Sequence, residues 1–189
     1  MDTLHPRAAQ VLAFWFRGDD RDPRWFAKAA EFDAEIRDTF LPVYDEAAQG
    51  AFAPWIDAPR ECLALILLLD QFPRNMFRGS ARAFATDAHA LAAAKEAVRR
   101  GHDRSMRPCE RMFLYLPFQH AESLEEQRAS ISLNAPLGEF PETFDVPRFA
   151  AAHLAIIERF GRFPHRNAAL GRPSTAEEVE FLKQPGSGF

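Results

Sequence analysis

The segment from Arg60 to Phe72 (RECLALILLLDQF) constrains the fold more than any other part of the chain, because a helix built from it is apolar on almost every face. A helix that is apolar all round has to be buried among other elements, whereas a surface helix keeps one polar side. We therefore expect a central helix that the other helices surround. Pro73 follows directly, and we expect it to end this helix because proline has no backbone N–H to donate.

Helical spacing also dominates the rest of the chain, and no segment shows the two-residue alternation of a strand. Pro6 opens a first helix, Gly50 ends a second helical region, and Pro108 opens another that Pro117 kinks or ends. Further helices are expected near residues 82–100, 149–160 and 174–182, and a polar segment over residues 120–134. The sequence thus predicts an all-α fold, and the short connections favour stacked antiparallel helix pairs.

The chain length of 189 residues is that of one domain, or of two small packed halves. We expect one all-helical domain with N-terminal helices over residues 1–58, core helices over residues 59–184 and a tail over residues 185–189. Ser174 with Glu177, or Thr175 with Glu178, has the spacing of a capping box and predicts the start of the last helix.

The overall charge is slightly acidic, with a net charge of −4 and a pI of about 5.9. Nucleic-acid binders and proteins of anionic membranes usually carry a basic excess, so these partners are disfavoured. The first ten residues lack the features of a signal peptide, and no apolar run reaches the ~20 residues of a membrane span. Only Cys62 and Cys109 are available for pairing, which favours a reducing cytoplasm.

Two apolar helices are each followed by a similar sequence, DQFPRNMFRG over residues 70–79 and GRFPHRNAALGR over residues 161–172. We call these the first and second Phe-Pro loops. Proline, phenylalanine and asparagine have structural roles in such turns, but those roles leave the many arginines unexplained. A helix C-terminus attracts Arg74 and Arg162, which is one explanation. The other is that the loops bind an anion.

The segment PCERMFLYLPFQHAES, residues 108–123, brings charged groups into an apolar stretch. A buried charge has to be paired or to shift its pKa, so Glu110 and Arg111 require partners. Glu110, Tyr115, His120 and Glu122 form either a structural network with the loop arginines or the acid and base groups beside a bound ligand. The sequence leaves both alternatives open.

Several long strings in the same order carry a family resemblance: QFPRNMFRG, then Thr86-Asp87, then ERMFLYLPFQHAES, then RFGRFPHRNAALGRPSTAEEVEFL. Together they resemble the bacterial family known as domain of unknown function 924, from about Val11 to Leu182. The resemblance implies an all-helical superhelix similar to tetratricopeptide-repeat (TPR) arrays, and it implies no activity. It also implies that both Phe-Pro loops and the segment around His120 matter.

Several familiar chemistries are disfavoured by the sequence. No P-loop, dinucleotide-binding glycine pattern, metalloprotease HExxH or G-x-S-x-G motif occurs. His120-x-Glu122 matches half of a zinc deaminase signature, but Cys109 has no second cysteine three residues on. We predict no metal site and no cofactor. Cys109 lies near two arginines, which favour a thiolate, but a buried unreactive thiol is the preferred interpretation.

The favoured hypothesis is a protein that binds a small anionic ligand, a carboxylate or phosphate compound, where the two loops meet the segment around His120. The predicted ligand-binding residues are Arg74, Asn75, Arg78, Arg111, Arg162, His165, Arg166 and Asn167. The candidate acid, base or proton-donor residues are Glu110, Tyr115, His120 and Glu122. A peptide-binding helical scaffold without catalysis is the alternative, and the sequence leaves dimerisation open.

Overall fold

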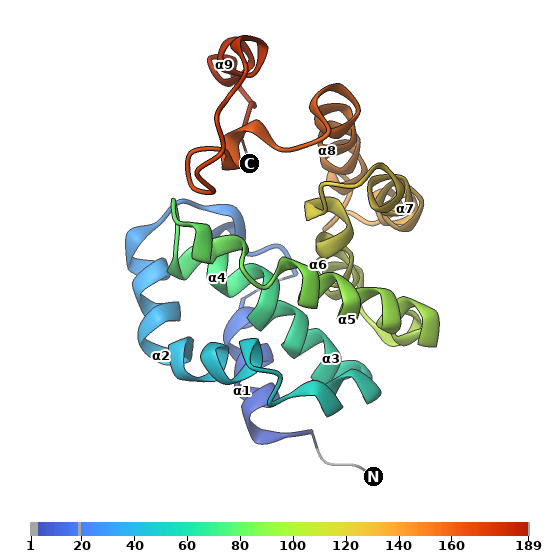
Figure 1. Cartoon of the computed structure of the whole chain (residues 1–189). Helices are drawn as coiled ribbons and strands as arrows, with labels where there is room; N and C mark the ends of the chain where they lie inside the picture. The colour runs from blue at the N-terminus through green and yellow to red at the C-terminus, as the bar shows by residue number, and fades with distance from the viewer. Residues whose placement is uncertain (1–3, 19, 189) are drawn as a thin grey trace.

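The structure, a computed structural model, describes residues 4–18 and 20–188, and within these ranges no residue lies in a strand. The α-helices are α1 (Pro6–Trp15), α2 (Ala30–Ala48), α3 (Pro59–Ile66), α4 (Phe72–Met76), α5 (Asp87–Arg100), α6 (Pro108–His120), α7 (Leu124–Asn134), α8 (Val146–Phe160) and α9 (Ala176–Leu182). The short 3-10 turns are η1 (Pro23–Phe26), η2 (Ala53–Asp57), η4 (Ala81–Phe84), η5 (His102–Ser105), η6 (Ala135–Glu139) and η7 (Pro164–Arg166). The all-α prediction is confirmed (Figure 1).

The central helix predicted from the apolar segment is present as α3 and its continuation. Every residue from Cys62 to Leu69 is at most 6% exposed. Helices α1, α5 and α6 pack against α3, and α2 packs against α4 (Figure 1). One apolar cluster, which includes residues from Ala8 to Val146, fills the space between them. The burial of the central helix therefore organises the first six helices.

The central helix does not end at Pro73, so that expectation is wrong. A π turn, η3 (Leu67–Gln71), joins α3 to α4, and Phe72 donates its backbone N–H to the carbonyl of Leu67, five residues back. Proline leaves the carbonyl of Leu69, four residues before it, without its usual donor. The hydroxyl of Thr86 donates to that carbonyl at 2.6 Å. This side-chain donor allows the helix to pass through the proline.

The segment expected to be simply polar, residues 120–134, contains helix α7, which packs against both α6 and α8. Helix α6 also continues through Pro117 as far as His120. None of the described helices is both long and apolar enough to cross a bilayer.

The C-terminal part has a small core of its own. Ile156, Ile157 and Phe163 are buried together, with Phe160 and Phe181 packed against them. Figure 1 shows α9 standing apart from the body formed by α1 to α6. Two apolar cores are therefore present, and the second Phe-Pro loop contributes Phe163 to the smaller one.

The capping box at the start of α9 is the one between Thr175 and Glu178. The Thr175 hydroxyl accepts from the Glu178 backbone N–H at 3.1 Å, and the Glu178 carboxylate accepts from the Thr175 N–H at 2.7 Å. The alternative pair, Ser174 with Glu177, does not form the cap.

Replacing Thr86 by valine tests the role of its hydroxyl in carrying the helix through Pro73. The buried carbonyl of Leu69 would lose its donor, and we expect Thr86→Val to lower the free energy of unfolding by about 1–3 kcal/mol. Urea denaturation measures the change. Thr39→Val, at an exposed position of α2, is the matched control and should have little effect. Equal stability of the two variants would contradict this account of the proline.

Candidate functional site

Asp70 is a fully buried carboxylate in the π turn of the central helix. It accepts from Nε2 of Gln71 at 2.6 Å and contacts Nδ1 of His120 at 2.8 Å and Nη1 of Arg74 at 3.2 Å. Burial alone would raise the pKa of this carboxyl, but Arg74 and His120 outweigh burial and hold the pKa below its ordinary value. Asp70 is therefore ionised, and it fixes three side chains around itself.

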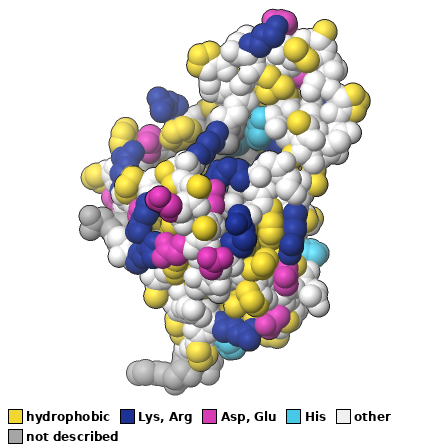
Figure 2. Space-filling model, turned by 90° about the vertical axis from the view of Figure 1, so that its left-hand side faces the viewer, with side chains coloured by type: hydrophobic (Ala, Val, Ile, Leu, Met, Phe, Trp, Pro, Cys, Tyr) yellow, Lys and Arg dark blue, Asp and Glu magenta, His cyan; other side chains and the backbone are white. Residues whose placement is uncertain are grey.

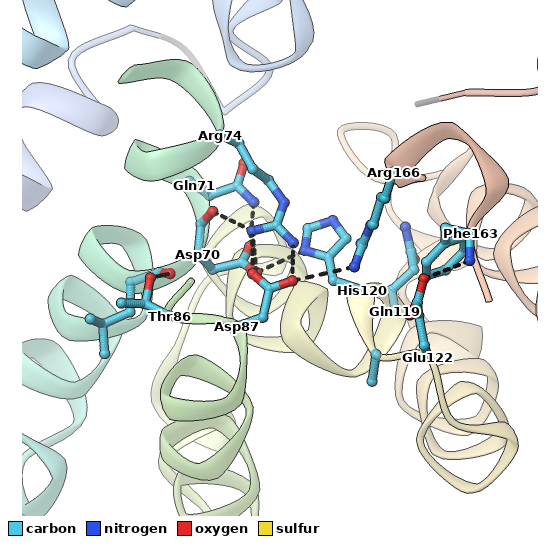
Figure 3. Close-up of polar contacts among 12 residues, drawn as sticks. Asp70, Gln71, Arg74, Thr86, Asp87, Gln119, His120, Glu122, Phe163 and Arg166 are labelled. Carbon is cyan, nitrogen blue, oxygen red and sulfur yellow. Dashed lines mark hydrogen bonds and ion pairs between the residues drawn. The ribbon is translucent and has the colours of Figure 1, made fainter. Parts of the chain in front are cut away.

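Arg74 links the first Phe-Pro loop to the start of α5. Its guanidinium donates to both carboxylate oxygens of Asp87, at 2.8 and 3.0 Å, and to the backbone carbonyl of Asp70 at 2.7 Å. Asp87 also contacts Nη1 of Arg166 at 3.3 Å. Figure 3 shows these groups in a row, with Asp87 between the two arginines. One carboxylate is thus shared by two guanidinium groups from different Phe-Pro loops.

Arg166, from η7 in the second Phe-Pro loop, is the less satisfied of the two arginines. Its side chain is 7% exposed, and its guanidinium lies 4.8 Å from the ring centre of Phe84 and 4.5 Å from that of Phe163. The Nε atom is buried and has no hydrogen-bond partner within residues 4–18 and 20–188. Burial, and then repulsion by Arg74, lower the pKa of Arg166 to about 10, although Asp87 and Glu122 act in the opposite direction. The charge of Arg166 is therefore incompletely compensated.

His120, at the end of α6, lies between the Arg74–Asp87 pair and the Arg166 side chain (Figure 3). Burial and the neighbouring Arg74 lower the pKa of His120, so the imidazole is neutral at pH 7. Because ionised Asp70 can only accept, Nδ1 of His120 carries the proton. Nε2 then holds a free electron pair, and it makes no hydrogen bond within the described part of the chain.

Two further histidines lie close to this group. The ring centre of His153 is 6.2 Å from that of His120, and Phe163 lies between His153 and His165. Burial, with His120 the next contribution, lowers the pKa of His153 to about 3, and burial with Arg166 next lowers that of His165 to about 4. Figure 2 shows a histidine side chain and Lys or Arg side chains beside a hollow in the upper half of the molecule, below the uppermost lobe.

We call Asp70, Arg74, Asp87, His120 and Arg166 the central cluster. Of the residues predicted from the sequence, it contains Arg74, His120 and Arg166. His165 precedes Arg166 in η7, and its ring centre lies 5.6 Å from that of Phe163. The structure thus brings the first Phe-Pro loop, the second Phe-Pro loop and the segment around His120 together at this point.

Other predicted residues hold the loops in place. Arg78 forms a two-bond ion pair with Asp33 and a hydrogen bond with Asn75, all between 2.8 and 3.1 Å. Arg162 forms a similar pair with Glu178, at 2.7 and 2.8 Å. These arginines are already neutralised by acids.

Two more predicted residues serve the second Phe-Pro loop. Asn167 donates to the Ser174 hydroxyl and to Glu178. The carboxylate of Glu122 accepts from the backbone N–H of Phe163 at 2.7 Å and from Arg172 at 2.6 and 2.9 Å. Both side chains therefore tie the loop to its surroundings.

Glu110, Arg111 and Tyr115 lie away from the central cluster. Glu110 is at the N-terminus of α6 and pairs with Arg60 and Arg107. It lies ten residues before His120, so the two residues are roughly 15 Å apart along the helix axis. Tyr115 donates to Asp103 at 2.7 Å, and Arg111 contacts its hydroxyl at 3.4 Å. The structure does not bring these three residues to the site.

Asp70 and Asp87 are not among the site residues predicted from the sequence. Asp70 is, like Glu110, a charged residue in an apolar stretch, and it therefore needs partners for the same reason. Asp87 gave a weaker signal, because an acid in the first turn of a helix has an ordinary role there.

Both cysteines are buried thiols. Burial raises the pKa of Cys62 and of Cys109 to about 12, and Arg107 beside Cys109 does not reverse the effect. The predicted burial of Cys109 is confirmed, and the raised pKa is what a buried thiol away from a thiolate-stabilising site would have.

Comparisons with known proteins identify relatives without an assigned activity. A sequence profile of the family described as "Bacterial protein of unknown function (DUF924)" matches residues 11–186. A solved structure of a protein of unknown function from Agrobacterium tumefaciens is 44% identical, with a TM-score of 0.86, and the match covers 94% of this chain and 97% of that one. The comparison with curated proteins gave no match.

Because buried histidines are held neutral in the folded protein, we expect the protein to lose stability in mild acid. An unfolded histidine takes up a proton near pH 6.5, whereas folded His153 does so only near pH 3. The unfolded chain therefore binds more protons below pH 6.5, and the free energy of unfolding falls as the pH falls. Between pH 6.5 and about 5 the carboxylates stay ionised, so histidines dominate this loss.

We expect His153→Gln to reduce the loss across this interval by about 1–2 kcal/mol, as measured by urea denaturation at several pH values. His89→Gln, at an exposed position of α5, is the matched control and should keep the wild-type pH dependence. The same pH dependence in all three proteins would show that His153 is not held neutral.

Proposed function

Because the chain belongs to the bacterial DUF924 family, whose description names no activity, we propose a function from the site itself: the protein binds a small anionic ligand beside Arg166 and His120. The ligand is a carboxylate or phosphate compound. Arg166 is the principal anion-binding group, Arg74 borders the site, and His120 is the acid–base group that faces the ligand.

The incomplete compensation of Arg166 is the observation that carries this proposal. A buried guanidinium normally has its donors satisfied, and each unsatisfied donor costs about 1–3 kcal/mol. Arg166 has one contact of 3.3 Å to a carboxylate that is bound more closely by Arg74, and its Nε has no partner within the described residues. An anion would supply the missing acceptors, and a bond between ions in a partly dry site is stronger than one between neutral groups.

The ion pairs of the other predicted arginines reduce the number of residues that can bind the ligand. Arg78 and Arg162 are each held by two bonds to one acid, so an anion would have to displace Asp33 or Glu178. Their role in the proposal is to shape the Phe-Pro loops, with Asn75 and Asn167 as hydrogen-bonding supports. His165 belongs with Arg166 at the ligand.

A TPR-like arrangement of the helices is the second part of the proposal. Helices α6, α7 and α8 pack in succession, as antiparallel helix pairs do, with a short connection between α6 and α7 and a longer one that contains η6 between α7 and α8. An apolar depression of about 240 Å³ between α2, α3 and α5, lined by Ile56, Leu65 and Leu69 among others, favours the alternative of a peptide-binding scaffold. Peptide binding there would be independent of Arg166.

Thermal unfolding in inorganic phosphate tests the anion site. At ten times its Kd, phosphate should add about 1.4 kcal/mol of stability, and so raise the Tm by roughly 3–6 °C in a chain of this size. Sodium chloride at the same ionic strength is the control for screening. We expect Arg166→Gln to abolish the shift and Arg99→Gln, at an exposed position on α5, to retain it. Equal shifts in both variants would contradict the proposal.

A further inference from the structure

His120 has the surroundings of a nucleophile as well as those of a proton acceptor. One ring nitrogen is held by Asp70 at 2.8 Å, and the other makes no hydrogen bond among the described residues. Guanidinium groups lie on two sides of the ring, Arg74 on one and Arg166 on the other (Figure 3). The His120 side chain is 13% exposed, so the ring is not fully sealed from solvent.

We propose that Nε2 of His120 accepts a phosphoryl group from a small phosphorylated ligand, such as an acyl phosphate, bound beside Arg166. This inference rests on the proposed anion site and names the class of ligand that the site takes. Asp70 is a positioning residue for His120, and Gln71 positions Asp70 through its 2.6 Å hydrogen bond.

Three physical requirements of phosphoryl transfer to histidine are met here. The imidazole has to be neutral, because only then does it have an electron pair to attack phosphorus, and burial keeps His120 neutral. The attacking nitrogen has to be fixed, which the bond from Nδ1 to Asp70 achieves. The negative charge of the phosphoryl oxygens has to be compensated, and guanidinium groups match these oxygens in geometry and charge.

The transfer to His120 and the hydrolysis that follows conserve atoms and electrons without a further reactant besides water. The Nε2 electron pair forms a bond to phosphorus while the bond from phosphorus to the carboxyl oxygen breaks, and the carboxylate leaves with that electron pair. The positive charge formed on the ring is stabilised by Asp70, which keeps its hydrogen bond to the Nδ1 proton. Water then attacks phosphorus, the P–N bond breaks, and dihydrogen phosphate and the neutral imidazole result.

The phosphoryl group would compete with Asp87 for Arg166. Asp87 retains two bonds of 2.8 and 3.0 Å to Arg74, so the loss of its single 3.3 Å contact to Arg166 leaves it satisfied. Arg166 would then turn its free Nε to the ligand without leaving an unpaired acid behind. A carboxylate ligand engages Arg166 equally well, but it gives His120 no group to accept.

Acetyl phosphate is the probe for this inference. The purified full chain is mixed with acetyl phosphate, quenched rapidly in alkali and analysed by intact mass spectrometry. We expect a gain of one phosphoryl group that is lost in acid, as expected for a phosphorus–nitrogen bond, and peptide mapping of the wild-type protein should locate it on His120.

Two variants and one matched control test the roles of His120 and Arg166 in forming the adduct. His120→Asn retains a donor for Asp70 but has no second nitrogen, so it should lose the adduct. Arg166→Gln should reduce adduct formation at least tenfold, and His89→Asn, on the exposed face of α5, should form the adduct normally. Circular dichroism of each variant confirms that it is folded.

The outcomes separate this inference from the anion site on which it rests. An adduct on His120 supports both. Stabilisation by inorganic phosphate without an adduct in the wild-type protein overturns phosphoryl transfer and leaves the anion site intact. No stabilisation and no adduct overturns both, and an adduct mapped to another residue overturns the role of His120.

Discussion

The burial of one carboxylate, Asp70, dictates how the surrounding elements come together. A charge inside the central apolar helix is tolerated only if other groups compensate it, because ionised groups lose several kcal/mol of hydration on burial. The π turn places Asp70 beside Gln71 and one turn from Arg74. The remaining partner, His120, is 50 residues away, at the end of α6. The demand of one buried charge thus fixes the end of α6 against the centre of the molecule.

The helices were largely predictable because their signals are local. Proline at the start of α6, glycine in a left-handed conformation after α5 and α8, and the capping box of α9 are each contained in a few consecutive residues. Pro73 was misinterpreted because the group that compensates for it, the Thr86 hydroxyl, lies 17 residues from the carbonyl it serves. Helix α7 was missed because its apolar face is weak and its helical structure depends on packing against α6 and α8.

The site was only partly predictable for the same reason. The sequence shows that arginines are numerous near the two Phe-Pro loops, but it does not show which acids neutralise them. The acid that binds Arg78 is 45 residues away, and the acid that Arg166 shares is 79 residues away. Only the folded chain distinguishes Arg78 and Arg162, which are paired with acids, from Arg166, whose Nε has no partner in the part of the chain that the structure describes. Spacing alone assigned all three the same role.

The central cluster joins the second Phe-Pro loop to the first Phe-Pro loop and to the start of α5, and this position explains how its charges are tolerated. The second Phe-Pro loop is joined to the body by polar bonds, among them Arg166 to Asp87 and Glu122 to Arg172 and Phe163. A junction built from ion pairs excludes water less completely than an apolar one, and so it can hold groups that a core would not accept. A purely structural junction would favour full pairing, since an unsatisfied buried donor costs stability. Arg78 and Arg162 are each paired with one acid, whereas Trp15 Nε1 and Gln119 Oε1 are, like Arg166 Nε, buried polar atoms without a partner among the described residues. Arg166, beside a neutral histidine, is a buried arginine whose Nε has no hydrogen-bond partner within residues 4–18 and 20–188, and the proposed anion would supply that acceptor.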